Sequence, residues 1–544
     1  MIRRIATVGG LTLVSRLSGF VRDVVMAAIL GAGPLADAFF VAFRLPNHFR
    51  AIFAEGAFAA AFVPAYARTL EEAGLPAAKL FADQIASALI LINLVLLGIA
   101  LLFTPEVVSV LAPGLSEDPE RFDLAVALTR ITFPYLALVS LQTLFSGILN
   151  ANNRFAMAAS APILLNLSLI ATLLLAPFFP DAGHAAAWGV LIAGVLQVLV
   201  VGGDAETHGY GLRFRMPRFD PETRRFLKAL GPAIIGAGGV QLALFADTLI
   251  ASYLPTGALS ALYYADRINQ LPIGVVGIAV GTVLLPEMSR RLAAGDTAGA
   301  ASAQARGIQL ALLLTIPCAA AAVAIPDLIM RALFARGAFT ADDALAAGNT
   351  LAAYSLGLIP FVLLRSFTAP FYARGDTATP VKAALLAAAV NVGLKVVLMG
   401  PLAQVGLALA TSVGAWINLV LLAILARRQG FAVSGAAIGG PVAKLAIIGV
   451  VFAAALFAGA MGLDRALASM SLFRDETALG ILVVLGGILY FVLVFLVLGR
   501  RWFMGLLKEV EREAELPAPK EAVLIEDVTD DAESLPDSEP PPKF

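Results

Sequence analysis

The chain has 544 residues, of which 59% are hydrophobic and 14% charged, and its mean hydropathy is +0.87. These values exclude an ordinary soluble protein and predict an all-α protein that crosses a membrane many times. The net charge of −1 argues neither for nor against nucleic acid, and we expect no nucleic-acid partner. The one cysteine, Cys318, excludes a disulfide within the chain, and three scattered histidines give no metal-ligand spacing. No metal and no cofactor are expected.

Fourteen segments are long enough to span about 30 Å of hydrocarbon. They lie at about 5–30, 35–67, 80–104, 122–150, 158–178, 184–203, 224–254, 258–290, 304–334, 343–373, 379–400, 404–427, 438–461 and 477–502. Arg3 and Arg4 lead directly into the first segment, which is too long for the apolar region of a cleavable signal peptide. Lys and Arg gather in one alternate set of loops, whereas the 104–123 loop is acidic. The positive-inside rule then places both termini in the cytoplasm.

The C-terminal 36 residues differ from the rest. Residues 509–544 hold twelve Asp and Glu against three Lys and Arg, with six prolines and few large apolar groups. Such a stretch cannot bury enough apolar surface to fold alone, so we expect a disordered acidic cytoplasmic tail.

The chain repeats itself at an offset of about 224 residues. Asp23 falls on Asp247 and, after two inserted residues, Leu45-Pro46 falls on Leu271-Pro272. Each copy holds six spans, so both copies have the same orientation, as in transporters with a central site between two lobes. The expected parts are an N-terminal lobe at 1–222, a C-terminal lobe at 223–430, two further spans at 431–508 and the tail at 509–544.

Charged side chains interrupt the first two segments. A guanidinium at membrane depth costs from about 2.5 kcal/mol upward, so it faces a partner or a water-filled cavity. Four arginines here outnumber three carboxylates: Arg16, Arg22, Arg44 and Arg50 against Asp23, Asp37 and Glu55. Because Arg suits bidentate capture of phosphate, the surplus predicts a site for a phosphorylated or otherwise anionic substrate. The alternative is an internal salt-bridge network that holds the two segments together without a ligand.

Prolines occupy matching places in the two copies. Pro46 breaks the second span beside Asn47, and Pro272 breaks the eighth. A proline removes one helical hydrogen bond and leaves carbonyl groups free, which suits a cavity wall. A kink that only shapes the packing is the alternative.

The second copy adds its own charged groups. Asp266 and Arg267 supply a further guanidinium near the interface of the lobes, and Asp247 is the counterpart of Asp23. Asn391 and Lys395 lie one turn apart on one helix face. A lone carboxylate there would take a coupling cation or a proton, but a lysine partner favours a fixed ion pair between Asp247 and Lys395.

No phosphate-binding loop, H-E-x-x-H or G-x-S-x-G motif is present, so the sequence does not predict an enzyme. The chain instead resembles the MurJ (MviN) family of the multidrug/oligosaccharidyl-lipid/polysaccharide exporter superfamily. The resemblance covers residues 1 to about 505, and its motifs are SRLSGFVRD at 15–23, DAFFVAFRLPN at 37–47, FAEGAF at 53–58, FVP at 62–64 and YYADR at 263–267.

The resemblance implies a lipid II flippase of the bacterial inner membrane, with two six-helix lobes in a V and alternating access. Its substrate would be an undecaprenyl-pyrophosphate-linked disaccharide-pentapeptide, moved from the cytoplasmic to the periplasmic leaflet for peptidoglycan synthesis and cell shape. Lipid II and membrane lipids would be its partners, and cell-wall synthesis proteins are candidates. Spans 13 and 14 would form a groove for the prenyl tail.

By resemblance, function depends on Arg16, Arg22, Asp37, Asn47, Arg50 and Arg267. Gln270 stands where the family often has Glu, and Lys395 stands where some members hold a cation with carboxylates. Two alternatives remain open. A cation-coupled drug or polysaccharide exporter of the same superfamily would need fewer arginines, and a membrane enzyme acting on polyprenyl phosphates would need a carboxylate or metal site.

Overall fold

The structure is a computed structural model that describes residues 2–50, 57–216, 221–431, 433, 435–470, 472–500 and 502. All regular elements in these ranges are helical, as the composition predicts. The N-terminal helices are α1 (Ile2–Leu30), α2 (Pro34–Arg50), α3 (Ala57–Leu102), α4 (Thr104–Leu111), η2 (Pro113–Glu117), α5 (Pro119–Thr132), α6 (Tyr135–Ala151), α7 (Ala156–Leu174), η3 (Ala176–Phe178) and α8 (Ala182–Thr207). The remaining helices are α9 (Pro221–Ser252), α10 (Ala258–Pro272), η4 (Ile273–Gly277), α11 (Ile278–Ala293), α12 (Thr297–Ala324), α13 (Pro326–Phe334), α14 (Ala341–Ser355), α15 (Leu358–Tyr372), α16 (Ala378–Arg428), α17 (Gly435–Ala466) and α18 (Arg474–Leu498).

Ten helical stretches among the described residues are long and apolar enough to cross a membrane. The protein is therefore a multi-pass membrane protein. Two of these stretches, α3 and α16, are broken by one residue with non-helical backbone angles, Gly74 (φ 78°) and Ala403 (φ 46°). Helices α1 and α9 are 29 and 32 residues long but do not belong to the ten, and charged residues lie within both.

The order of elements recurs along the chain, as the sequence repeat predicts. A short helix, α4 or α13, precedes a pair of helices separated by two residues. In the first copy α5 ends at Thr132 and α6 begins at Tyr135, and in the second α14 ends at Ser355 and α15 begins at Leu358. The two copies therefore share a helix break at the same point.

The proline positions behave differently in the two copies. Helix α10 ends at Pro272 and is followed by a π-helical turn, η4, because the proline removes one hydrogen bond from the helical ladder. Helix α2 instead continues through Pro46 to Arg50, so the expectation that the second span breaks at Pro46 is wrong. One missing hydrogen bond bends a helix without ending it.

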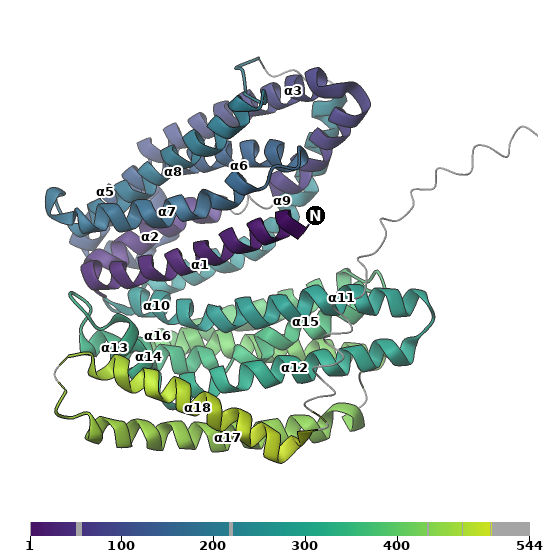
Figure 1. Ribbon diagram of the computed structural model, residues 1–544. Coiled ribbons are helices and arrows are strands. Elements are labelled where there is room, and N and C mark those ends of the chain that lie inside the picture. The colour runs from purple at the N-terminus through teal and green to yellow at the C-terminus, as the bar shows by residue number, and fades with distance from the viewer. Residues whose placement is uncertain are drawn as a thin grey trace, which may run out of the picture.

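Helices α1–α8 form one group and helices α10–α18 form a second, with α9 crossing between them (Figure 1). We call the first group and the α10–α16 part of the second the N-terminal and C-terminal halves. Helices α17 and α18 lie along the side of the C-terminal half that faces away from α1 (Figure 1). They pack on each other and on α12, and contribute Phe452, Leu456 and Tyr490 to one apolar core.

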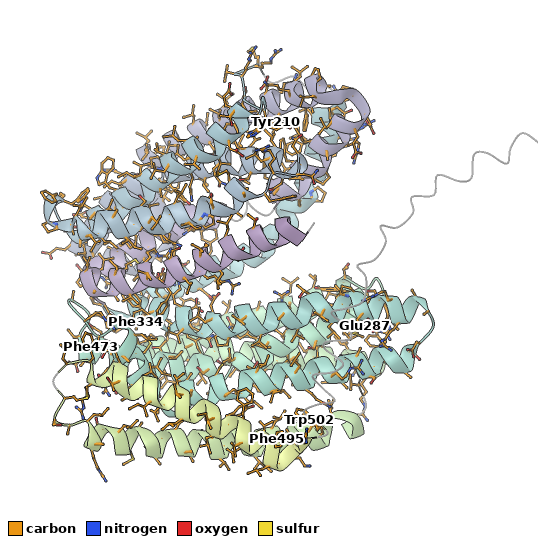
Figure 2. All side chains as sticks on the ribbon, viewed as in Figure 1. Tyr210, Glu287, Phe334, Phe473, Phe495 and Trp502 are labelled. Carbon is orange, nitrogen blue, oxygen red and sulfur yellow. The ribbon has the colours of Figure 1, made fainter. Side chains whose placement is uncertain are left out.

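The two halves meet at one end of the molecule. Phe334 of α13 lies where the groups join (Figure 2) and packs against Phe20 of α1, with ring centroids 6.4 Å apart. The backbone N–H of Ala338 donates to the carbonyl of Ala28 at 2.7 Å. Gly337 has φ +60° and approaches Ala28 so closely that a Cβ would lie 2.2 Å from its carbonyl oxygen. This end is closed, whereas the halves diverge at the end where the N-terminus lies (Figure 1).

Candidate functional site

A cavity of about 430 Å³ lies where α2, α9, α10 and α16 approach one another. Its charged and amide-bearing lining residues are Arg44, Asn47, Asp247, Asp266, Arg267, Gln270 and Lys395. Both halves contribute, and Phe43, Leu262 and Phe361 supply apolar walls. We call this the central cavity. A mixed apolar and charged lining at a junction of two bundles is the usual form of a ligand site.

Arg22 on α1 forms the N-terminal side of a charged cluster next to this cavity. Its guanidinium donates to Asp23 Oδ1 from Nε (3.0 Å) and from a terminal nitrogen (2.6 Å). The other terminal nitrogen donates to Asn166 Oδ1 on α7 at 2.9 Å. Arg22 is only 7% exposed, so these bonds fix its position.

Tyr263 and Arg267 on α10 complete the cluster from the C-terminal half. The Tyr263 hydroxyl donates to Asp23 Oδ1 at 3.2 Å and accepts from Arg22 at 3.4 Å and from Arg267 at 3.1 Å. Arg267 also lies 3.7 Å from Asp23 Oδ2 and 4.7 Å above the Tyr263 ring. One carboxylate thus serves two guanidinium groups, and the Arg267 side chain remains 39% exposed.

Two further arginines, Arg16 of α1 and Arg44 of α2, face the same junction. Arg16 is exposed and its guanidinium lies beside Gly274 in the π-helical turn of the opposite half. Arg44 lines the central cavity. The sequence predicts that Arg22, Arg50 and Arg267 converge on one central cavity. Arg22 and Arg267 share the partner Tyr263, but of these two only Arg267 lines the central cavity, and the Arg50 side chain lies outside the described residues.

Asp247 and Lys395 form an ion pair on the wall of the central cavity, as the sequence predicts. The Lys395 side chain is 4% exposed, and that of Asp247 is 36% exposed. Each charge neutralises the other across α9 and α16, which is what a buried ammonium requires. Among the described residues there is also no group of three or more metal-ligating side chains.

Asp266 and Gln270 lie one turn apart on α10, and the Gln270 amide donates to Asp266 Oδ2 at 3.0 Å. Gln270 therefore binds the neighbouring carboxylate in the place where a family Glu would repel it. Asn391 lies outside the central cavity, where it packs against Gly414 within α16. Pro46 is buried in α2, and Pro272 precedes the π-helical turn.

Asp37 lies apart from the central cavity, although the sequence groups it with the substrate-binding residues. It is fully buried (0% exposed) and binds the first turn of α10. Oδ1 accepts from the backbone N–H and the hydroxyl of Ser260 at 3.0 and 2.6 Å, and Oδ2 accepts from the N–H of Gly257 at 2.7 Å. Arg121 donates to Oδ2 at 3.1 Å. Asp37 thus links the halves at the closed end.

Two expected site residues fall outside what the structure describes: the side chain of Arg50 and all of Glu55. Three residues that the sequence analysis did not assign to the site nevertheless bind residues that it did assign: Asn166, Tyr263 and Arg121. Asn166 had a signal, because the repeat aligns it with Asn391, and Tyr263 lies in the YYADR motif. Arg121 had only a weak signal, as the one basic residue within the acidic 104–123 loop.

The sequence model of the family described as "Lipid II flippase MurJ" matches residues 26–474. A protein from Rhizobium tropici named "Probable lipid II flippase MurJ" is 42% identical over 505 residues, which cover 92% of this chain and 95% of that one. The chain belongs to the MurJ family. A second MurJ relative, "Lipid II flippase MurJ" of Burkholderia cenocepacia, is 36% identical over 435 residues, covering 79% of this chain and 84% of its own.

Solved structures agree on the fold. "Lipid II flippase MurJ, inward closed conformation" matches with a TM-score of 0.75 at 24% identity, covering 90% of this chain and 98% of that one. An inward-facing multidrug resistance transporter of the MATE family and MOP superfamily matches with a TM-score of 0.63 at 14% identity. The match covers 76% of this chain and 94% of that one. The chain therefore shares its fold with these two transporters.

Proposed function

We propose that the chain flips lipid II, the undecaprenyl-pyrophosphate-linked disaccharide-pentapeptide, from the cytoplasmic to the periplasmic leaflet of the bacterial inner membrane. Its role is then to supply precursor for peptidoglycan synthesis. One observation carries the proposal: Arg22 and Arg267 come from opposite halves and share the single carboxylate of Asp23. Two guanidinium groups with one counter-charge leave room for an anion, and a diphosphate fits their bidentate geometry.

The wider charge balance supports an anionic substrate. Around the junction the described cations are Arg16, Arg22, Arg44, Arg267 and Lys395, and the described carboxylates are Asp23, Asp247 and Asp266. Removal of the Asp247–Lys395 pair from this count leaves four arginines against two carboxylates. Intramembrane charge of one sign is stable when a ligand or water supplies the balance.

For the topology we propose fourteen spans with both termini in the cytoplasm. The ten apolar stretches become fourteen when α1 and α9 are added and α3 and α16 are each divided at their non-helical residue. Two six-span lobes with the same orientation then follow from the repeat. Spans 13 and 14, α17 and α18, present many exposed apolar residues, which suits contact with a prenyl chain.

The closed end provides the basis for alternating access. If the N-terminus is cytoplasmic, the end held by Asp37 and by Ala28 with Ala338 faces the periplasm. The arginine cluster is then reached from the cytoplasmic side, where substrate is made. Release on the other side requires these contacts to break while contacts at the diverging end form.

The test is replacement of the chromosomal flippase of a bacterium by this chain, with growth and the outside-accessible fraction of lipid II as readouts. We expect survival and normal accessibility with the wild-type chain. Arg267→Ala should fail in both readouts at unchanged membrane level. Arg225→Ala is the matched control, because Arg225 is an exposed arginine of α9 whose ion-pair partner among the described residues is Glu222.

A wild-type chain that is made at normal level and does not restore outside-accessible lipid II would refute the proposal. Normal transport by Arg267→Ala would refute the arginine site while leaving the flippase activity intact. Export of unrelated cationic drugs in place of lipid II would favour the cation-coupled exporter.

A further inference from the structure

A second cavity, of about 590 Å³, lies within the N-terminal half between α6, α7 and α8. Its size falls within the range of small-molecule sites. The hydrogen-bonding side chains of its lining are Tyr135, Gln142, Thr143, Ser146, Asn150 and Gln197, and no lining residue carries a charge. We call it the neutral cavity.

The neutral cavity lies on the inner side of the N-terminal half. On α8, Gln197 is 3% exposed, whereas Trp188, Ile192 and Leu199 are exposed on the opposite helix face. Helix α1 packs on α7 and helix α2 packs on α6. The neutral cavity is therefore closed by α8 on the outer side and lies behind the two helices that carry the arginines.

It also adjoins the arginine cluster along α7. Leu165 lines the cavity, and the next residue, Asn166, accepts a hydrogen bond from Arg22 at 2.9 Å. Asn166 further donates to the Ser18 hydroxyl of α1 at 2.9 Å. The neutral cavity and the arginine cluster therefore involve neighbouring residues of α7.

The lining retains unused hydrogen-bonding capacity. Gln142 uses one amide hydrogen, towards Ser146 at 2.7 Å, and its other hydrogen and its oxygen have no partner in the described structure. Gln197 donates to the carbonyl of Ala161 at 2.8 Å, which fixes its amide orientation, and its oxygen is buried without a described donor. The accessible donors and acceptors lie on α6, where Thr143, Ser146 and Asn150 are half-buried, so this wall suits a hydroxyl or amide guest.

The uncharged, hydrogen-bonding lining of the neutral cavity suits one part of lipid II better than the others. A prenyl chain would leave these amides and hydroxyls unpaired, and a peptide carboxylate would find no cation in the lining. A coupling cation would find no carboxylate. Sugar hydroxyls and acetamido groups match uncharged donors and acceptors, and the rings of Tyr135 and Phe155 add apolar faces.

We propose that the neutral cavity binds the uncharged carbohydrate part of the substrate while the arginine cluster binds its diphosphate. The inference rests on the proposed function, since it divides one substrate between two adjoining sites. It assigns specificity for the glycan to Gln142, Asn150 and Gln197, and affinity for the anion to Arg22 and Arg267.

The test compares two lipids on the purified full-length protein in lipid nanodiscs. Undecaprenyl pyrophosphate carries the diphosphate and no sugar, whereas lipid II carries both. We expect Gln142→Met and Asn150→Leu each to raise the Kd for lipid II by roughly tenfold, the effect of one or two lost hydrogen bonds, and to change the Kd for undecaprenyl pyrophosphate less than about twofold. Arg267→Ala should weaken both lipids.

Gln404→Met is the matched control for side-chain shape, because Gln404 lies on α16 outside both cavities. Unchanged affinity of both neutral-cavity variants for lipid II would overturn the inference and leave the proposed function standing. An equal loss for both lipids would also overturn it, since the effect would then not depend on the sugar. Failure of the wild-type protein to bind either lipid would instead count against the proposed function.

Discussion

At the scale of single residues, exposure separates the roles of the two clustered arginines. Arg22 is 7% exposed and its guanidinium is held by Asp23 and Asn166, so it orients the cluster. Arg267 is 39% exposed, and its bond to the Asp23 carboxylate is long at 3.7 Å. Arg267 is therefore the more accessible of the two from the central cavity, and we propose that it is the one that meets an anion there.

The first prediction concerns Arg267. Arg267→Ala should weaken binding of undecaprenyl pyrophosphate by at least about tenfold, because one charge-assisted hydrogen bond contributes about 1.5–3 kcal/mol. Arg267→Lys should recover only part of the affinity, since an ammonium keeps the charge and loses the planar fork. Titration of the purified Arg267→Ala and Arg267→Lys variants with undecaprenyl pyrophosphate measures the two affinities. Equal affinities of these variants would contradict the role of bidentate geometry.

The second prediction concerns Asp247 and Lys395. Asp247→Ala should be more harmful than the double change Asp247→Ala with Lys395→Ala, because the single change strands a lysine that is 4% exposed. Breaking a buried pair costs up to about 3–5 kcal/mol, and the partial exposure of Asp247 lowers that figure. The comparison is made by measuring the thermal unfolding temperature and the complementation of the single and the double variant.

Because Lys395 already neutralises the Asp247 carboxylate, we also expect transport to be insensitive to sodium. Sodium-dependent transport that Asp247→Ala abolishes would contradict the ion-pair interpretation. Lys382→Ala, which changes an exposed lysine of the same helix, is the control for lost charge.

At the scale of elements, the beginning of α10 depends on the other half of the molecule. Gly257 precedes α10 with φ +87° and supplies no capping side chain of its own. Asp37 of α2 accepts the N–H groups of Gly257 and Ser260 in its place. A carboxylate at a helix N-terminus also interacts favourably with the helix dipole. One residue of α2 therefore stabilises α10 only while the closed end is closed.

The third prediction is that Asp37→Ala destabilises the closed end. The substitution removes four hydrogen bonds and leaves Arg121, which is 7% exposed, without its carboxylate. The expected loss is about 3–5 kcal/mol in favour of conformations with this end open. Labelling with a polar maleimide of a cysteine introduced at Ala258, which is 3% exposed in the first turn of α10, reports the opening in a Cys318→Ala background. An unchanged labelling rate in Asp37→Ala would show that this contact does not hold the end closed.

At the scale of the whole molecule, the closed end is the contact that alternating access must break. The fourth prediction follows from the Ala28–Ala338 hydrogen bond, which brings α1 against the loop after α13. Cysteines at positions 28 and 338, in a Cys318→Ala background, should crosslink and stop transport, and a reducing agent should restore it. Persistent transport by a fully crosslinked protein would exclude opening at this end.

The fifth prediction concerns the acidic segment beyond Lys508, which the structure does not describe. Truncation after Lys508 should leave complementation unchanged, because a chain this acidic and poor in apolar residues contributes no packed surface to the transporter. Growth and membrane level of the truncated chain measure this. Loss of function at a normal level would reveal a partner for the tail.

Much of the protein follows from the order of its residues. Hydropathy gives the helical membrane class because each span must satisfy its own backbone hydrogen bonds in lipid. The aligned Asp23 and Asp247 reveal the repeat, and the surplus of Arg over Asp and Glu indicates an anion. The Asp247–Lys395 pair is predictable because an unpaired buried charge is so unfavourable that a lysine on the facing span finds the carboxylate.

Other features depend on how the halves meet, which hydropathy and helix periodicity do not encode. The sequence places Asp37 and Arg267 in one group, yet the structure puts Asp37 at the start of α10 and Arg267 beside Asp23. Pro46 lies within α2 without ending it, whereas Pro272 ends α10. Whether a Leu-Pro pair ends a helix therefore depends on how that helix is packed. Local sequence thus determined which groups enter the membrane, and only the contact between distant helices decided which groups pair.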